Sequence, residues 1–449
     1  MGNRCKTGCG KWASDGGLCK SCKREGRTPS PNKMVAPTPI STPRMENREP
    51  AHLYSAACKG DVEAVRALLE HPFFDADAEA GINKPFSDVN EKVSWPTHET
   101  DGSTALVAAS ERGHLQVVEL LCAQPDIDVN LARTDGATGL FLACCLGHSS
   151  VVPALLQSGA DVNLAAETGA SPVYIAAVNG HVDCLRPLLA VPSLQVNQTD
   201  DKGCSPIFLS ATYGQAACLE LLLTHPEVAL NDHPEEPPLL AAIVNDYPLA
   251  VAALAAHPAI AINAQSARLG SSALYLACLL GRASCLPALL AHPEIQLNGV
   301  SRNGEVPLHA AARAGHVECI TPLLGAKGVD VNAKRADGAT PLFLAVVKNH
   351  AACIPPLLAC AALDVNAQND LGATALFLAV VHEHQACLDA LLTHPGIDVS
   401  LADRDGTTPL EAAEHAGNDA VAAALRSHVA TARDGEEEVA AGAAQLHIS

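Results

Sequence analysis

Aromatic residues are scarce in this sequence, at 3% of 449 positions. A pocket lined by several aromatic side chains, which is common in small-molecule sites, is therefore not expected. Catalytic motifs are missing as well: the chain has no G-x-x-x-x-G-K-S/T, no G-x-S-x-G, no H-E-x-x-H and no protein-kinase motif set. The sequence predicts a protein that is not an enzyme.

Long hydrophobic runs are also missing. The most apolar stretch, residues 249–262, is interrupted by His257-Pro258 and is too short to span a bilayer. The N-terminus has no apolar segment of the kind that directs secretion. Because the chain nevertheless has 17 cysteines, we expect them to be kept reduced inside the cell, with the cytoplasm favoured and the nucleus left open.

Basic residues are outnumbered, since 29 Lys and Arg stand against 49 Asp and Glu, for a net charge of −20. A chain of this charge does not attract nucleic acid through its overall field. The first 33 residues are an exception, because they carry eight Lys or Arg against Asp15 and Glu25. This basic segment could contact nucleic acid, which is the weakest of the three functions that the sequence suggests. The other two, an interaction scaffold and a ubiquitin-pathway adaptor, are described below.

A repeat of about 34 residues dominates the rest of the chain. It is visible in "DGATGLFLACCLGHSSVVPALLQSGADVN" (135–163) and "DGATPLFLAVVKNHAACIPPLLACAALDVN" (337–366). One apolar residue recurs with this period, at Leu106, Leu140, Val173, Ile207, Leu239, Leu274, Leu308, Leu342, Leu376 and Leu410. An asparagine closes many of the units, at Asn130, Asn163, Asn197, Asn231, Asn263, Asn298, Asn332 and Asn366.

Each unit reads as two short helices and a hairpin. Asp-Gly forms a tight turn, Thr caps the first helix, and Pro suits its first position. A glycine ends the first helix in most units, where a left-handed conformation is needed, and a second apolar helix follows. A single unit cannot bury its apolar face, so the units must stack on one another.

The pattern resembles the ankyrin repeat, whose Thr-Pro-Leu-His-x-Ala signature survives best as "VPLHAA" at 306–311. The resemblance covers about residues 51–430 in eleven units. It implies an all-α solenoid of helix-turn-helix units with hairpin loops, and a surface of hairpins and first helices that binds a protein partner. We therefore predict a monomeric interaction scaffold or adaptor.

Some units depart from the pattern. Asp246, Asn349 and Glu383 stand where the glycine ends the first helix elsewhere, and Asn tolerates the left-handed region better than Glu does. Prolines inside several second helices predict helices that start late or bend. These are Pro153, Pro187, Pro287, Pro322, Pro355 and Pro356.

Six cysteines recur at one point of the second helix, at Cys184, Cys218, Cys285, Cys319, Cys353 and Cys387. Since free cysteine behaves as a small buried hydrophobe, this spacing predicts core packing rather than redox chemistry. The recurring His-Pro pairs, such as 225–226 and 292–293, are spread along the array. They indicate helix ends and not a shared metal site.

Four other cysteines lie off this period, in "CKTGCGKWASDGGLCKSC" at residues 5–22. Cys5, Cys9, Cys19 and Cys22 form two close pairs separated by a loop, which suits a closed thiolate site for one structural Zn²⁺. A disulfide is not expected to persist in a reducing compartment. So short a segment cannot build a core, and metal binding would supply its folding energy.

This segment is similar to the A20-type zinc finger in its C-x3-C-G start and its G-x-C-x-x-C end followed by basic residues. The resemblance implies ubiquitin binding. The loop between the cysteine pairs is shorter than in that family, and Lys11-Trp12 replaces its aromatic pair, which leaves Trp12 as the one aromatic side chain for such a contact. A ubiquitin-pathway adaptor with substrate-selecting repeats is the second functional alternative.

The sequence divides into four parts. These are a zinc-finger-like module at 1–26, a Pro/Ser/Thr linker expected to be disordered at 27–50, the repeat array at 51–430, and a disordered acidic and alanine-rich tail at 431–449. An insertion at about 73–100, which contains Trp95, interrupts the array. Because such insertions form loops on one face, often the binding face, Trp95 is a candidate partner contact.

Overall fold

The structure is a computed structural model, which describes residues 49–70, 102–231, 236–268 and 270–428. The chain divides into Met1–Asn47 and Arg48–Ser449, and all described residues belong to the second part. The predicted zinc-finger module, the insertion at 73–100 and the tail at 431–449 lie outside the described residues.

The described residues form short helices that come in pairs. They are α1 (Glu49–Lys59), α2 (Val62–Leu69), α3 (Ala105–Arg112), α4 (Leu115–Cys122), α5 (Gly139–Leu146), α6 (Val151–Gln157), α7 (Pro172–Asn179), α8 (Val182–Leu189), α9 (Pro206–Thr212), α10 (Ala216–Leu222), α11 (Pro238–Val244), α12 (Pro248–Ala255), α13 (Ala273–Leu279), α14 (Leu286–Leu290), α15 (Pro307–Ala314), α16 (Val317–Gly325), α17 (Pro341–Val347), α18 (Ile354–Leu358), α19 (Ala375–Val381), α20 (Gln385–Leu392) and α21 (Pro409–His415). Residues 419–428 form a last helix after α21. The eleven pairs are the eleven predicted units, numbered here from 1 (α1 and α2) to 11 (α21 and 419–428).

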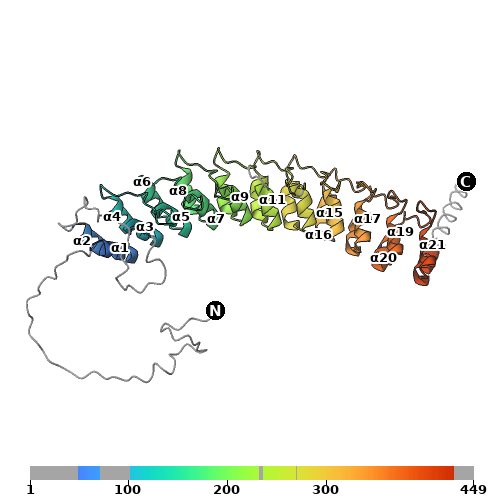
Figure 1. The fold of residues 1–449 in the computed structure, drawn as a ribbon. Coiled ribbons are helices and arrows are strands. Elements are labelled where there is room, and N and C mark those ends of the chain that lie inside the picture. Colours follow the sequence, from blue (N-terminus) through green and yellow to red (C-terminus); the bar gives the residue numbers. More distant parts are fainter. Residues whose placement is uncertain (1–48, 71–101, 232–235, 269, 429–449) are drawn as a thin grey trace, which may run out of the picture. The chain divides into compact units, whose positions relative to one another are not determined.

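The units stack in chain order (Figure 1). First helices pack on first helices, as α3 does on α5 and α13 on α15, and second helices pack on second helices, as α10 does on α12. In the described ranges, β-structure is limited to three isolated bridges, such as that between Ala132 and Thr138. These contacts confirm the all-α solenoid.

The recurring apolar residues form the core. All of them are buried except Leu410 of unit 11, which is partly exposed. The six recurring cysteines are buried too, which confirms their predicted role in packing. Burial raises the pKa of the Cys319 thiol to about 12, so little thiolate forms at neutral pH. Each cysteine that the structure describes is a free thiol.

The glycine that ends a first helix is required for two reasons. Gly315 has a φ of 82°, a conformation that side chains disfavour. A Cβ atom at Gly315 would also lie 2.7 Å from Nδ1 of His350, in the next unit. The His350 ring is held there because its Nε2 lies 3.2 Å from the carbonyl oxygen of Arg313. The turn of one unit therefore makes room for the histidine of the next.

Three units have another residue in place of this glycine. Asp246, Asn349 and Glu383 all have positive φ, at 62°, 58° and 56°. Beyond Asp246, Arg282 takes the place of the histidine: its Nη1 lies 3.3 Å from Asp246 Oδ2 and its Nη2 donates to the Val244 carbonyl. The Asp246 side chain thus gains a partner instead of meeting a ring, whereas the unit after Asn349 keeps its turn histidine, His384.

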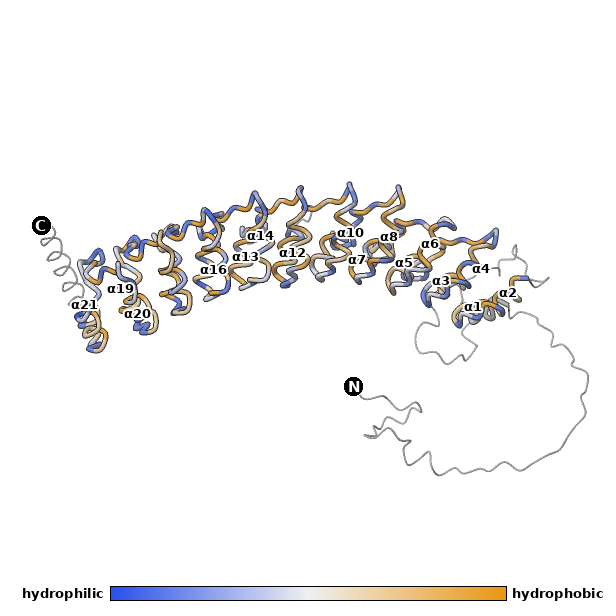
Figure 2. Tube along the Cα trace, turned by 180° about the vertical axis from the view of Figure 1, so that it is seen from behind, coloured by the Kyte–Doolittle hydropathy of each residue, from blue (hydrophilic) through white to orange (hydrophobic). Residues whose placement is uncertain are grey.

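The asparagines that close the units link each unit to the next. Asn332 Nδ2 donates to the Ala362 carbonyl at 2.6 Å, and the Asp364 N–H donates to Asn332 Oδ1 at 2.8 Å. The same pair of bonds recurs at all eight asparagines of the series. Polar tips of the joining loops and hydrophobic residues in every helix pair are visible in Figure 2.

Prolines delay the start of some second helices, as predicted. Single 3-10 turns, η1 (Ala283–Cys285) and η2 (Ala351–Cys353), precede α14 and α18, and α6 begins only at Val151. Pro187 and Pro322 instead lie inside α8 and α16, which begin directly after the turn histidine. The late start is therefore confirmed for three helices. For α8 and α16, which do not start late, the alternative of a bend stays a prediction.

Candidate interaction surface

Exposed apolar side chains concentrate at one place in the repeat. We call the two residues before the left-handed residue of each unit the turn row. Among the described residues, nine large hydrophobic side chains are exposed. Five of them lie in the turn row, and these are Leu146, Tyr213, Val244, Leu280 and Val381. Because the units stack, the turn row runs along the array, and aligned exposed apolar residues are typical of interaction sites.

A buried carboxylate links three consecutive units. Glu305 precedes α15 and only 3% of it is exposed. It accepts a hydrogen bond from Tyr275 Oη at 2.7 Å, and it forms ion pairs with Arg313 Nη2 at 3.2 Å and Arg335 Nη1 at 3.1 Å. Tyr275 belongs to unit 7, Arg313 to unit 8, and Arg335 to the hairpin of unit 9. This cluster fixes the hairpins against the first helices.

The charges of this cluster are mutually stabilised. Burial by itself raises the pKa of Glu305, but the hydrogen bond from Tyr275 and the charges of Arg313 and Arg335 outweigh it and hold that pKa below its ordinary value. Arg335 also pairs with Asp337, and that hydrogen bond lowers the pKa of Asp337 to about 2. The carboxylates of Glu305 and Asp337 are therefore ionised at neutral pH.

His309, the histidine of the "VPLHAA" signature, is fully buried beside this cluster. Its Nδ1 accepts the backbone N–H of Val306 at 3.2 Å, so Nε2 carries the proton and donates to the Ala339 carbonyl at 3.0 Å. The ring thus caps its own helix and binds the next hairpin. Burial lowers the pKa of His309, which favours this neutral form.

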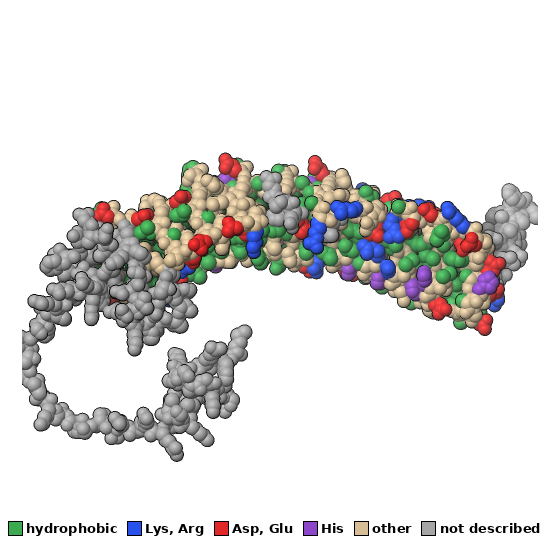
Figure 3. Space-filling view, in the orientation of Figure 1, with side chains coloured by type: hydrophobic (Ala, Val, Ile, Leu, Met, Phe, Trp, Pro, Cys, Tyr) green, Lys and Arg blue, Asp and Glu red, His purple; other side chains and the backbone are tan. Residues whose placement is uncertain are grey.

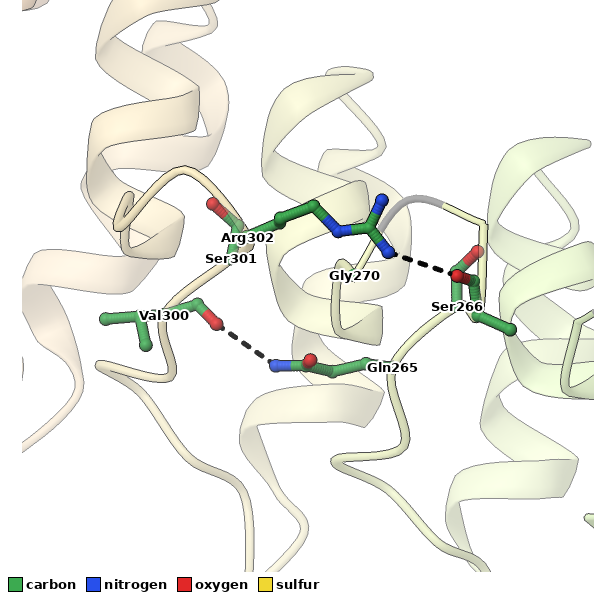
Figure 4. Close-up of a pocket in the computed structure, with 7 residues that line it drawn as sticks. Gln265, Ser266, Gly270, Val300, Ser301 and Arg302 are labelled. Carbon is green, nitrogen blue, oxygen red and sulfur yellow. Dashed lines mark hydrogen bonds between the residues drawn. The ribbon is translucent and has the colours of Figure 1, made fainter.

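A shallow hollow lies between the hairpins of units 7 and 8 (Figure 4). Its lining residues are Gln265, Ser266, Ala267, Gly270, Val300, Ser301 and Arg302. Gln265 Nε2 donates to the Val300 carbonyl at 3.0 Å, and Arg302 Nη2 donates to the Ala267 carbonyl at 3.2 Å in the opposite direction. Side chains thus tie the two hairpins together across the hollow.

The predicted zinc ligands Cys5, Cys9, Cys19 and Cys22 lie outside the described residues, and so do the candidate contacts Trp12 and Trp95. In the part that the structure describes, no three His, Cys, Asp or Glu side chains come together as metal ligands. The His-Pro histidines act locally: in four pairs, Nδ1 accepts the backbone N–H two residues later, as His292 does from Glu294. No described helix is both long and apolar enough to cross a membrane.

Comparison with known proteins identifies the fold family. A family model described as ankyrin repeats (3 copies) matches residues 40–132, 140–234, 173–266, 238–335, 274–369, 320–403 and 342–434, which together exceed half of the chain. The chain belongs to the ankyrin repeat family. Ankyrin repeats generally mediate protein–protein interaction and are typically not enzymes, so the array implies a protein partner.

One similar solved structure is the crystal structure of the ankyrin repeat domain of Bcl-3, described as a unique member of the IkappaB protein family. It is 27% identical in sequence, and the match covers 50% of this chain and 100% of that one with a TM-score of 0.46.

Proposed function

We propose that this chain is a non-enzymatic scaffold or adaptor of the cytoplasm, whose ankyrin array binds a protein partner as a monomer. The turn row carries the proposal, because it holds five of the nine exposed large hydrophobic side chains among the described residues. Isolated exposed apolar residues need no explanation, but Tyr213, Val244 and Leu280 come from the successive units 5, 6 and 7, and such a run favours a docking surface.

The partner is expected to be lost when charge enters the turn row. In affinity purification from cells with the full chain, replacing both Leu146 and Tyr213 by Glu should reduce the recovery of the main partner at least about tenfold, since each buried anchor contributes about 1–2 kcal/mol. Leu371→Glu is the matched control, because Leu371 is 68% exposed but lies in the hairpin before α19, whereas the turn row is at the other end of that helix. Equal recovery by all three proteins would reject the turn row as the binding face.

The N-terminal module adds a second contact in this proposal. Cys5, Cys9, Cys19 and Cys22 would bind one structural Zn²⁺, a hypothesis supported by their paired spacing. Through the linker at 27–50, such a module would raise the avidity of an adaptor whose array binds the same assembly. Ubiquitin recognition through Trp12 stays a prediction from the partial resemblance to the A20-type finger.

Metal content tests the module directly. The purified full chain should contain one zinc per molecule by elemental analysis, and Cys19→Ser should remove it, because three thiolates do not complete the site. Cys360→Ser is the control, since this half-buried thiol belongs to the array and its loss should leave the zinc in place. A full chain without zinc at neutral pH would reject the site.

A further inference from the structure

The turn row loses its charged residues in the middle of the array. The C-terminus of a helix favours nearby cations, and the turn rows of units 1, 2, 8 and 9 hold such residues, at Lys59, Arg112, Arg313 and Lys348. In units 3 to 7 no turn-row side chain is charged, and each is at least partly exposed. Figure 3 shows Lys, Arg and His side chains gathered over the later units, from α15 to α21. We call the uncharged turn row of units 3 to 7 the central row.

The central row is continuous from unit to unit. The side chain that follows the turn of one unit bonds to a carbonyl group in the turn row of the unit before it. Gln215 Nε2 donates to the Val178 carbonyl at 3.2 Å, which joins units 4 and 5. Arg282 Nη2 donates to the Val244 carbonyl at 2.9 Å, which joins units 6 and 7. Neighbouring turns are therefore in contact, and their exposed side chains form one surface.

Two tyrosines supply this surface with hydrogen-bond donors. Tyr213 is 55% exposed, and Tyr247, which follows the turn of unit 6, is 36% exposed. The Tyr247 ring lies against the turn next to Tyr213, since a Cβ atom at Gly214 would be 2.4 Å from Tyr247 Cδ1. Among the residues that the structure describes, neither hydroxyl group has a hydrogen-bond partner. An occupant of the central row is therefore expected to offer acceptors as well as apolar side chains.

The spacing of the units indicates the conformation of the occupant. Packed helices lie about 8–10 Å apart, so equivalent turn-row positions recur at about that distance. A polyproline II segment has three residues per turn and rises about 3.1 Å per residue, so every third side chain lies on one face, about 9 Å from the one before. Its backbone makes no internal hydrogen bonds, which leaves its carbonyl groups free to accept from tyrosine. Segments of this kind dock on surfaces lined by aromatic side chains.

Building on the proposed scaffold function, we infer that the central row binds a polyproline II segment of a partner protein that has a large aliphatic side chain at every third residue. These side chains contact Tyr213, Val244 and Leu280 of units 5, 6 and 7, which are 55%, 37% and 38% exposed. Val244 stands one position earlier in its unit than the other two, so the segment lies over a surface two residues wide. Tyr213 and Tyr247 donate to its carbonyl groups.

Two other occupants fit less well. A partner helix would place every seventh side chain on one face, about 10.5 Å apart, but its carbonyl groups are bonded within the helix and offer the tyrosine hydroxyls no acceptor. The chain's own linker at 27–50 is rich in proline. Its aliphatic residues Met34 and Ile40 are six residues apart with Pro37 between them, so it does not offer a large aliphatic side chain to each successive unit.

The test uses the full chain and a fluorescein-labelled peptide of sequence GPPLPPLPPLPPLPPG, with binding measured by fluorescence anisotropy. A peptide of the same composition with adjacent leucines, GPPPPPLLLLPPPPPG, is the spacing control. The spaced peptide should bind at least about tenfold more tightly, because four leucines instead of two lie on one face and meet the central row. Since neither surface is charged, binding should not weaken as salt is raised.

Variants assign the site. Leu280→Ala should weaken binding of the spaced peptide at least about threefold, since the apolar contact of one unit is lost. Leu371→Ala is the matched control, because Leu371 is 68% exposed but lies in the hairpin before α19, and it should change binding less than about twofold. The double change Tyr213→Phe and Tyr247→Phe keeps both rings and should weaken binding at least about threefold, because two hydrogen bonds are lost. Unchanged thermal unfolding of this double variant confirms that its fold is retained.

Several results would overturn the inference. These are equal binding of the two peptides, absence of binding by both, wild-type affinity of the double variant, and tighter binding of a helical peptide with leucine at every seventh residue, LAEAAAKLAEAAAKLAEAAAKL. The last result would assign the central row to a partner helix. Tighter binding of the spaced peptide after Met34→Ser and Ile40→Ser in the full chain would assign it to the chain's own linker.

Recovery of the main partner from cells separates this inference from the proposed function. If the Leu146→Glu, Tyr213→Glu protein loses its partner while the two peptides bind equally to the unchanged chain, the turn row stands as the binding face and only the polyproline II occupant is rejected. If that protein keeps its partner while the spaced peptide binds as expected, the main partner binds elsewhere and the occupant of the central row stands.

Discussion

Replacement of Glu305 by alanine is expected to lower the free energy of unfolding by about 3 kcal/mol. The carboxylate is almost inaccessible and neutralises Arg313 and Arg335, whose side chains are 32% and 28% exposed. Removing one partner of a buried ion pair leaves the other charge uncompensated, which costs about 3–5 kcal/mol. Because both arginines reach solvent, the lower end of this range applies.

Urea unfolding followed by circular dichroism measures this effect. Glu318→Ala is the matched control, because Glu318 pairs with His316 in the same unit but its side chain is 50% exposed. An exposed pair contributes at most about 1 kcal/mol. If Glu305→Ala were no more destabilising than Glu318→Ala, the cluster would not fix units 7 to 9 together.

The same cluster makes the free energy of unfolding fall at low pH. The folded pKa of Glu305 lies below its ordinary value of 4.5, so its contribution is complete above that pH and is lost as pH falls through the folded value. Asp337, with a folded pKa of about 2, acts in the same direction. Glu305→Gln, which keeps the shape but cannot ionise, should therefore lose less stability than the wild type between pH 5 and pH 3.

Most of the fold could be predicted because stacking repeats the same buried positions. An apolar residue such as Leu308 meets an equivalent neighbour in each adjoining unit, so the core appears in the sequence as a fixed period. The left-handed turns could be predicted for the same reason, down to the aspartate, asparagine and glutamate that replace glycine. The metal hypothesis for Cys5, Cys9, Cys19 and Cys22 stays a prediction, since the described residues do not include them.

The Glu305 cluster was missed because no single unit contains it. Tyr275 and Arg335 each lie thirty residues from Glu305 in the chain, and only the stacking of neighbouring units brings them together. A signal was nevertheless present. The equivalent position before the first helix holds a small residue in other units, as in Ala170, Ser271 and Ala339. Unit 6, with Glu236, has the one other glutamate of this series. A glutamate among small residues at a buried position indicates a charge that needs partners.

The contacts of the turn histidines could not be predicted from the sequence either. Four units carry a glycine and a histidine side by side, at 113–114, 147–148, 180–181 and 315–316, which suggests a contact within one turn. The ring that meets Gly315 is instead that of His350, because the turn of one unit packs against the turn of the next. The exposed apolar surface of the turn row could not be predicted either, because turn-row residues such as Leu146 and Tyr213 follow no consensus of the repeat.

His309→Ala is expected to cost about 3 kcal/mol of the free energy of unfolding. The change leaves a cavity at a fully buried site. It also removes the partners of the Val306 N–H and the Ala339 carbonyl, and each unsatisfied group costs about 1–3 kcal/mol. Leu249→Ala, at an exposed position, is the control and should change the stability by less than about 0.5 kcal/mol. A cost below 1 kcal/mol at His309 would contradict the bridging role of its ring.

A pH series separates the ring's hydrogen bonds from its volume. Burial holds the folded pKa of His309 below its ordinary value of 6.5, so the unfolded chain takes up the proton first. The contribution of His309 is therefore complete above pH 6.5 and is lost as pH falls from there toward the folded value. Phe343 and Phe377 occupy the equivalent position in units 9 and 10, so His309→Phe keeps the volume without titrating. Its stability should fall less than that of the wild type between pH 7 and pH 5; parallel curves would show that the buried histidine does not resist protonation.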